Sequence, residues 1–230
     1  MMKRTRIAIL GCYRSGTTAV AGALHHLGVD MGAPFFEGFY EAADLSKHLR
    51  KWWDEPHLVE KASQAKRIRV LKQWIEGREK GGAQWVGMKH PLLSLCGEDL
   101  VQAWGPETKF IRCCRPLEES IDSLKRLGRK LDGAFLQGTL MGALDGFFAG
   151  REHLSIEFAD FMSDPPRGLR RVMEYLQITA DADKVATALR FIEPGSRSKV
   201  EIEQGEKIGA GRDSRLKAAL GALCKVVTGR

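Results

Sequence analysis

The sequence predicts an α/β fold, in which a central, mostly parallel sheet of four to five strands lies between two layers of helices. Four short apolar runs have the length and composition of buried strands, and they fall at residues 6–10, 84–88, 109–113 and 154–158. Longer segments with the apolar periodicity of helices separate these runs. Because parallel strands need crossover connections that are usually helical, this alternation favours a three-layer sandwich.

The predicted helices lie between the strands and after the last one. They cover residues 17–27, 42–53, 57–79, 98–104, 117–129, 133–150, 166–176, 182–191 and 214–226. Ser163 and Asp164 precede two prolines, a pattern typical of a helix start. Residues 193–213 carry glycines and charges with little periodicity, so we expect a long loop over the ligand site there.

Length and composition predict one domain that spans residues 1–230. The chain has 230 residues, of which 43% are hydrophobic and 28% are charged, as is ordinary for a globular protein with a single core. No internal repeat or shift in composition marks a domain boundary. In such a domain, ligands are expected at the carboxyl ends of the strands and in the loops that follow them.

Charge and cysteine content narrow the kinds of partner. The net charge of +7 and the isoelectric point near 9.2 favour an anionic ligand. We expect no nucleic-acid partner, because the basic residues are scattered and no nucleic-acid-binding motif is present. The five cysteines include no Cys-x-x-Cys pair, which predicts neither a zinc site nor a disulfide framework and fits a reducing cytoplasm. No segment is long and apolar enough to be predicted as a membrane span.

The most informative segment is the loop at residues 11–18, Gly-Cys-Tyr-Arg-Ser-Gly-Thr-Thr, which joins the first strand to the first helix. A strand, a glycine-bounded turn and a helix in this order point backbone N–H groups and the positive helix end into one concavity, where they bind an oxyanion. The spacing is that of the P-loop motif G-x-x-x-x-G-K-[ST], with Gly11, Gly16 and Thr18 in place. The predicted fold is therefore like that of P-loop NTPases.

The lysine of that motif is missing, since Thr17 occupies its position and the nearest cation is Arg14 inside the loop. A nucleoside triphosphate site needs the lysine at the β- and γ-phosphates and a bound Mg²⁺. A cation within the loop and a doubled threonine suit a less charged transferable group that needs no metal. We therefore predict no metal site.

Residues 14–18, Arg-Ser-Gly-Thr-Thr, resemble the 5′-phosphosulfate loop of sulfotransferases, which use 3′-phosphoadenosine 5′-phosphosulfate (PAPS) and release 3′,5′-diphosphoadenosine (PAP). The resemblance implies that this loop binds the 5′-phosphosulfate through a set of five residues. These are Arg14, Ser15, Gly16, Thr17 and Thr18. It also implies that Arg14 or Lys89 offsets the charge that grows on the bridging oxygen.

A second resemblance lies at the end of the third predicted strand. Sulfotransferases hold the 3′-phosphate with an arginine at the end of this strand and a serine eight positions later on the next helix. Arg115 and Ser123 keep that spacing. Pro116 follows Arg115 directly, whereas the family usually has one residue between them, so Arg112 stays open as an alternative to Arg115.

Two residues are candidates for the general base that an acceptor hydroxyl requires. Glu41 lies in a segment, 38–45, that resembles the Gly-x-x-Glu-Asp segment of bacterial sulfotransferases. His90 follows Lys89 directly, close to where cytosolic members place a histidine in a Lys-x-His arrangement. The resemblance favours Glu41 modestly, with Glu37 as a third possibility.

The resemblance extends over residues 6 to about 195, and one departure weakens it. Phe158, Ala159 and Asp160 stand where the family has Tyr-Glu-Asp. We expect a PAPS-dependent sulfotransferase whose acceptor is a hydroxyl or amine of a carbohydrate or small metabolite, although the sequence does not identify it. A P-loop kinase for small molecules or nucleotides and a non-catalytic nucleotide-binding module are the alternatives.

Overall fold

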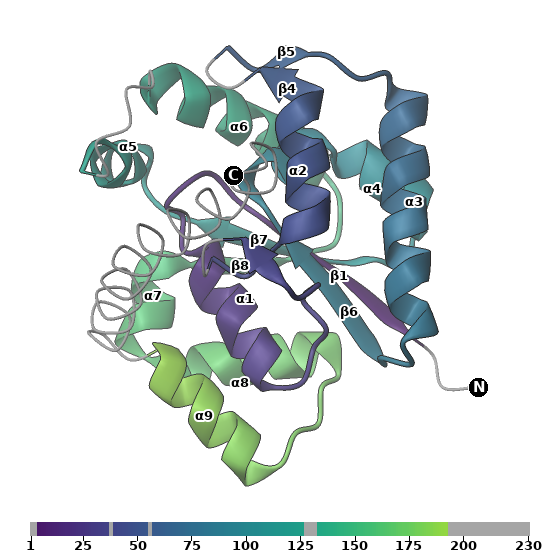
Figure 1. Ribbon diagram of the computed structural model, residues 1–230. Coiled ribbons are helices and arrows are strands. Elements are labelled where there is room, and N and C mark those ends of the chain that lie inside the picture. The colour runs from purple at the N-terminus through teal and green to yellow at the C-terminus, as the bar shows by residue number, and fades with distance from the viewer. Residues whose placement is uncertain (1–3, 37–38, 55–56, 127–132, 193–230) are drawn as a thin grey trace, which may run out of the picture. The chain divides into compact units, whose positions relative to one another are not determined.

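The computed structural model describes residues 4–36, 39–54, 57–126 and 133–192, and its central feature is a four-stranded parallel sheet (Figure 1). The strand order is β6 (Trp85–Lys89), β1 (Thr5–Leu10), β7 (Lys109–Cys114), β8 (Leu154–Glu157). All three pairings are parallel. The predicted α/β class and the mostly parallel sheet are confirmed.

The register of the sheet aligns the carboxyl ends of three neighbouring strands, β6, β1 and β7. Ile9 of β1 lies opposite Lys89 of β6, and Leu10 lies opposite Arg112 of β7. The residues that follow these strands therefore meet at one edge of the sheet, where the sequence placed the ligand.

Helices cover both faces of the sheet, which makes three layers. Ile7 and Ile9 point into one core and Ala8 and Leu10 into the other, and all four are completely buried. A strand with both faces buried reads as a continuous apolar run, as this one does.

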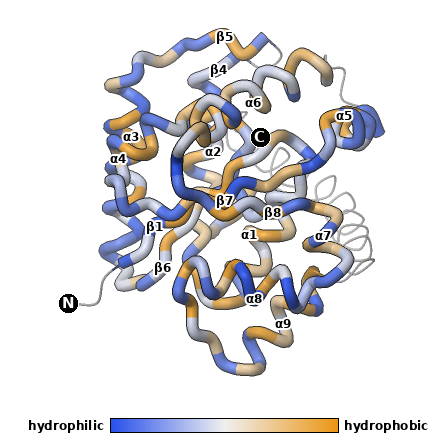
Figure 2. The backbone as a smooth tube through the Cα atoms, turned by 180° about the vertical axis from the view of Figure 1, so that it is seen from behind, coloured by the Kyte–Doolittle hydropathy of each residue, from blue (hydrophilic) through white to orange (hydrophobic). Residues whose placement is uncertain are grey.

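The helices divide between these two cores. The face of Ile7 and Ile9 packs against α1 (Thr17–His26), α7 (Phe158–Ser163), α8 (Pro165–Leu176) and α9 (Ala182–Ile192). The face of Ala8 and Leu10 packs against α2 (Ala43–Trp52), α3 (Gln64–Lys80), the 3₁₀ helix η1 (Pro91–Leu95), α4 (Gly97–Trp104) and α6 (Gly133–Phe148), and α5 (Leu117–Lys125) packs on α6. Helix α8 contains both hydrophilic and hydrophobic residues (Figure 2), and Leu169, Val172 and Leu176 are buried on its side that faces the core.

Short elements near the site differ from the sequence-based expectation. A two-strand pair of β2 (Phe35–Phe36) and β3 (Glu41–Ala42) precedes α2 and was not predicted. The strand expected to reach residue 158 ends at Glu157, and Phe158 begins α7. The next helix starts at Pro165, where the Asp164 side chain accepts a hydrogen bond from the Arg167 N–H (3.1 Å), so the predicted proline start is confirmed within one residue.

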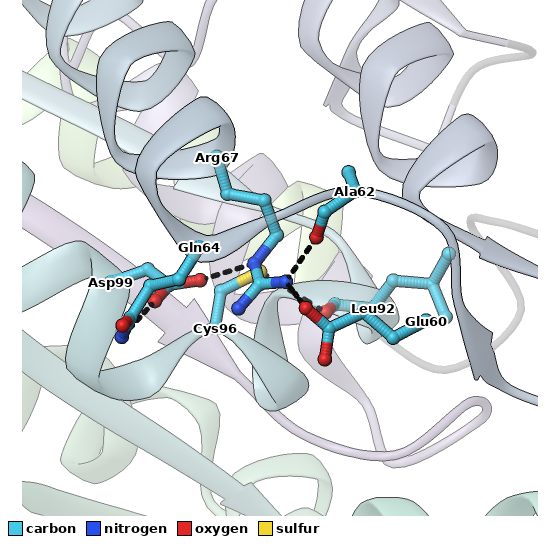
Figure 3. Close-up of polar contacts among 7 residues, drawn as sticks. All are labelled: Glu60, Ala62, Gln64, Arg67, Leu92, Cys96 and Asp99. Atoms are coloured by element: carbon cyan, nitrogen blue, oxygen red, sulfur yellow. Dashed lines mark hydrogen bonds and ion pairs between the residues drawn. The ribbon is translucent and has the colours of Figure 1, made fainter.

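The helix expected from residue 57 begins only at Gln64, so that prediction was wrong at its start. Residues Val59–Glu60 form β5, which pairs with β4 (Trp53–Asp54). The buried guanidinium of Arg67 holds this junction: it donates to Asp99 Oδ2 (2.5 Å) on α4, to the Ala62 carbonyl (2.7 Å) and to Glu60 (Figure 3). The pairing with β4 and the ion pair with Arg67 hold Glu60 in an extended segment before Gln64.

Some expectations fall outside the described residues. These are the loop at 193–213, the helix at 214–226, the end of the helix at 117–129, and Glu37.

Candidate functional site

The loop between β1 and α1 requires glycine at both of its motif positions. A Cβ atom on Gly11 would lie 2.5 Å from Ser15 Oγ and 2.9 Å from the carbonyl oxygen of Cys113. Gly16 has a φ of 91°, and a Cβ atom there would lie 2.4 Å from Phe158 Cδ2. Both positions therefore exclude side chains on steric grounds, and the second also on conformational grounds.

Side chains from four parts of the chain hold the carbonyl groups of this loop. Four consecutive carbonyl oxygens accept hydrogen bonds from side chains: Gly11 from Ser94 Oγ (3.2 Å), Cys12 from Ser15 Oγ (2.8 Å), Tyr13 from Gln137 Nε2 (2.6 Å) and Arg14 from Arg115 Nη1 (3.3 Å). A trans peptide places its N–H opposite its C=O. Each peptide N–H therefore points away from the side chain that holds the carbonyl of the same peptide, and the N–H of Ser15 donates to the Cys12 carbonyl (3.3 Å).

The helix that follows the loop adds to this electropositive character. Gly16 is the N-cap of α1, where no side chain of the described residues makes a capping hydrogen bond, and the first turn of α1 contains no acidic residue. The first N–H groups of a helix have no partner within the helix. Together with the outward carbonyls, this end of α1 has the chemistry of an oxyanion site.

The predicted loop residues differ in exposure. Ser15 and Thr17 are buried, Gly16 and Thr18 are half-buried, and Arg14 is exposed. The buried Thr17 side chain cannot supply the cation of a P-loop lysine, so Arg14 is the cation of the loop itself. Its backbone adopts a φ of 62°, in the left-handed region that residues other than glycine rarely occupy.

Arg115 and Ser123 meet the loop on one side. Arg14 Nε donates to Ser123 Oγ (3.0 Å) on α5. The Arg115 guanidinium donates to the Arg14 carbonyl and to Glu119 Oε2 (3.1 Å), and it lies 4.7 Å from the ring centre of Phe158. The structure therefore brings Arg115 and Ser123, which the sequence paired by spacing, to the edge of the loop at residues 11–18, which is called the anion loop below.

Arg112, the alternative to Arg115, lies in a different environment. Its guanidinium forms an ion pair with Asp145 on α6 and lies 5.7 Å from the ring centre of Phe148. Neither interaction involves the loop at residues 11–18.

Glu41, Lys89 and His90 form one buried cluster. Lys89 Nζ donates to Glu41 Oε1 (2.8 Å) and to the carbonyl oxygen of Phe39 (3.2 Å). His90 Nε2 lies 3.6 Å from Glu41 Oε2. The side chains of Glu41 and Lys89 are 8% and 3% exposed. The two base candidates, far apart in sequence, thus belong to the same cluster.

The hydrogen bond that begins η1 assigns the His90 tautomer. His90 Nδ1 accepts from the Leu92 N–H (3.1 Å), so the neutral imidazole carries its proton on Nε2, which is the nitrogen that faces Glu41. In this tautomer the N–H of Nε2, and not a lone pair, faces the carboxylate, at a separation of 3.6 Å that is longer than a hydrogen bond.

Charge and burial oppose each other in this cluster. Burial raises the pKa of Glu41, but Lys89 and His90 outweigh that effect and hold it below its ordinary value of 4.5. Burial lowers the pKa of Lys89; Glu41 opposes this shift, whereas the charge of Arg14 adds to it. Glu41 is therefore ionised at neutral pH, and Lys89 lies within electrostatic range of the loop cation.

Sequence reasoning missed Ser94 and Gln137, which hold the loop from η1 and α6. Each is a polar residue in an apolar stretch, Leu-Leu-Ser-Leu and Phe-Leu-Gln-Gly, and both are buried. A polar side chain at a position that should be in the core was the available signal, but it does not say what the side chain contacts.

Two further properties concern only the described ranges. No helix there is long and apolar enough to cross a membrane. Within the same residues, no group of three or more His, Cys, Asp or Glu side chains is arranged to hold a metal ion.

Comparison with known proteins defines the fold class. The chain has an α/β fold with a central four-stranded parallel sheet, and it matches P-loop structures of sulfotransferases and of a sugar kinase. No protein-family model matches the sequence, and no curated protein matches it.

The solved structures that it resembles are distant in sequence. Sulfotransferase STF1 from Mycobacterium tuberculosis is 18% identical with a TM-score of 0.51, over 82% of this chain and 71% of that one. The sulfotransferase domain of the Synechococcus olefin synthase is 19% identical with a TM-score of 0.51, over 85% and 79%. A sugar kinase from Janibacter is 15% identical with a TM-score of 0.50, over 76% and 96%. At these identities the likeness concerns the fold.

Proposed function

We propose that this chain is a sulfotransferase that moves the sulfuryl group of PAPS to a hydroxyl or amine of a small-molecule or carbohydrate acceptor. The observation that carries the proposal is the meeting of Arg14, Ser123 and Arg115 at the edge of one anion loop. Two guanidinium groups and a hydroxyl at this edge suit a ligand with two separate anionic groups.

The residues present fit PAPS. The uncapped start of α1 and the loop with outward carbonyls suit the 5′-phosphosulfate, and we assign Arg14, Ser15, Gly16, Thr17 and Thr18 to it. We assign Arg115 and Ser123 to the 3′-phosphate, because Arg115 contacts the loop whereas Arg112 pairs with Asp145. When bound, PAPS supplies the sulfuryl group and a diphosphoadenosine leaving group.

Glu41 is our assignment for the general base. Its carboxylate is ionised at neutral pH and can accept the proton of an acceptor hydroxyl. His90 carries its proton on the nitrogen that faces Glu41, so we assign it the role of orienting that carboxylate. Lys89 keeps Glu41 ionised and, with Arg14, provides positive charge beside the loop.

A second candidate is a P-loop kinase acting on a small molecule. The Janibacter sugar kinase shares the fold over 96% of its length, and Gly11, Gly16 and Thr18 keep the motif spacing of nucleotide kinases. Thr17 in place of the lysine speaks against it. The two candidates differ in their need for a divalent cation.

Calorimetric titration with PAP, and separately with ATP, in the presence of Mg²⁺ or of EDTA tests the proposal. We expect PAP to bind equally well in both buffers and more tightly than ATP. We also expect Arg115→Ala to weaken PAP binding about 10- to 100-fold, the range for charge-assisted hydrogen bonds. Its effect on adenosine 5′-phosphosulfate, which lacks the 3′-phosphate, should be much smaller.

Arg112→Ala is the matched control, since it removes a guanidinium on β7, three residues before Arg115, and should leave PAP binding unchanged. Binding of ATP with Mg²⁺ in preference to PAP would favour the kinase. Equal losses for PAP and adenosine 5′-phosphosulfate in Arg115→Ala would remove Arg115 from the 3′-phosphate.

A further inference from the structure

Gln137 is a completely buried carboxamide that joins α6 to the anion loop. Its Nε2 donates to the carbonyl oxygen of Tyr13 (2.6 Å). Its main-chain carbonyl accepts a contact from Cys12 Sγ (3.7 Å). α6 thus contacts two consecutive residues of the loop through one residue of its own.

Only the donor half of this carboxamide is used. Among the described residues, Gln137 Oε1 is buried and has no hydrogen-bond partner. A buried acceptor without a donor costs free energy, and an apolar side chain of the same shape would avoid that cost. Stability alone therefore does not account for a glutamine at this position.

The bond from Gln137 bears on the strained residue of the loop. Rotation of the peptide between Tyr13 and Arg14 by half a turn would carry the φ of Arg14 from 62° into the ordinary negative region. The same rotation would turn the Tyr13 carbonyl away from Gln137 to where the Arg14 N–H now points. The hydrogen bond from Nε2 opposes this rotation, because it holds the carbonyl outward.

We infer that Gln137 is a positioning residue that keeps the Tyr13–Arg14 peptide in its anion-binding orientation. The loop then presents an N–H rather than a carbonyl oxygen to the ligand, and it does so before the ligand arrives. The identity of that ligand as PAP or PAPS rests on the proposed function, whereas the orientation of the peptide concerns any anion in the loop.

The test is Gln137→Met, which keeps the length of the side chain and removes both the donor and the unpartnered oxygen. Binding of PAP and of inorganic pyrophosphate is measured by calorimetry, and Tm is measured by thermal unfolding. We expect both ligands to bind about tenfold more weakly, the upper end for one hydrogen bond. Tm should stay close to that of the wild type, because losing the bond to Tyr13 is offset by losing the unpartnered oxygen.

Thr139→Val is the matched control, because the Thr139 hydroxyl lies on the same helix and, among the residues that the structure describes, bonds within that helix, to the Phe135 carbonyl (2.8 Å). It should leave both affinities unchanged. If Gln137→Met binds both ligands as the wild type does, the inference is overturned. A wild type that binds pyrophosphate but not PAP overturns the proposed function, and the pyrophosphate comparison still decides the role of Gln137. A wild type that binds neither overturns both.

Gln137→Glu covers the case in which the methionine variant does not fold. An ionised glutamate cannot donate to the Tyr13 carbonyl, but a protonated one can. Relative to the wild type at each pH, its pyrophosphate affinity should recover as the pH is lowered from 8 to 5. A constant ratio of affinities over that range would overturn the inference.

Discussion

Replacing Lys89 by methionine should destabilise the fold strongly, by leaving the Glu41 carboxylate buried without its cation. Lys89 Nζ lies 2.8 Å from Glu41 Oε1. Two unit charges at that separation attract each other by about 6 kcal/mol at an effective dielectric constant near 20. Desolvation of both charges opposes this attraction, so breaking such a buried pair costs about 3–5 kcal/mol. We expect a loss of that size in the free energy of unfolding at pH 7.

The loss should depend on pH in a direction that follows from the pKa of Glu41. In the wild type this pKa lies below 4.5. The carboxylate therefore contributes its full share to the free energy of unfolding above pH 4.5, and this share is lost as the pH falls through the pKa of the folded state. In Lys89→Met, the effect of burial on Glu41 is opposed by His90 and Arg50 without Lys89, and the pKa of Glu41 rises. The penalty then develops as the pH rises above 4.5. Both effects make the difference between the two proteins larger at pH 7 than at pH 4.

Urea unfolding at pH 4, 5, 6 and 7 measures this difference, with Glu41→Gln and the double variant completing a thermodynamic cycle. The double variant should be less destabilised than Lys89→Met, because it removes the uncompensated charge. A loss below about 1 kcal/mol at pH 7, as is usual for exposed pairs, would refute the buried ion pair. So would a loss of the same size at pH 4 and pH 7.

Two further outcomes are expected. Gly16→Ala should cost about 1–3 kcal/mol of stability, because of its φ of 91° and the clash with Phe158, and should weaken PAP binding. Urea unfolding beside Gly28→Ala isolates the clash, because Gly28 has a φ of 98° but an added Cβ there would have no described atom within 4 Å apart from its chain neighbours; equal losses would contradict the clash. Glu41→Gln should lower the rate at which PAP is formed in the presence of an acceptor by about 100-fold or more and should keep the affinity for PAP, whereas His90→Asn should have a smaller effect. Unchanged turnover in Glu41→Gln would exclude Glu41 as the base.

Much of the fold could be predicted because its strands are local patterns. The strands of the sheet are short segments rich in apolar residues, and β1, which is buried on both faces, is the easiest of them to recognise. The start of α3 could not be predicted, because the segment before it is held by contacts with other parts of the chain, namely the pairing of β5 with β4 and the bonds of Arg67 to Glu60 and Asp99. Partners such as Asp99, 32 residues away, leave no periodic signal.

In the candidate site, too, local motifs could be predicted and contacts between distant residues could not. The loop at residues 11–18 is a contiguous motif, and the spacing of Arg115 and Ser123 is also local, so sequence could single them out. The contacts of Ser94 and Gln137 span 83 and 124 residues. Only the fold brings these residues to the loop. A serine or glutamine in an apolar stretch of sequence does not indicate which group its side chain contacts.

The 3₁₀ helix η1 has a mechanical consequence for the site. His90 begins it beside Glu41, and Ser94 near its other end is hydrogen-bonded to both the N–H and the carbonyl of Gly11. At about 2 Å per residue, four residues of 3₁₀ helix span only about 8 Å. Because η1 is short and buried, it has little room to bend. If the loop shifted on binding an anion, η1 would therefore move as a rigid body and displace His90.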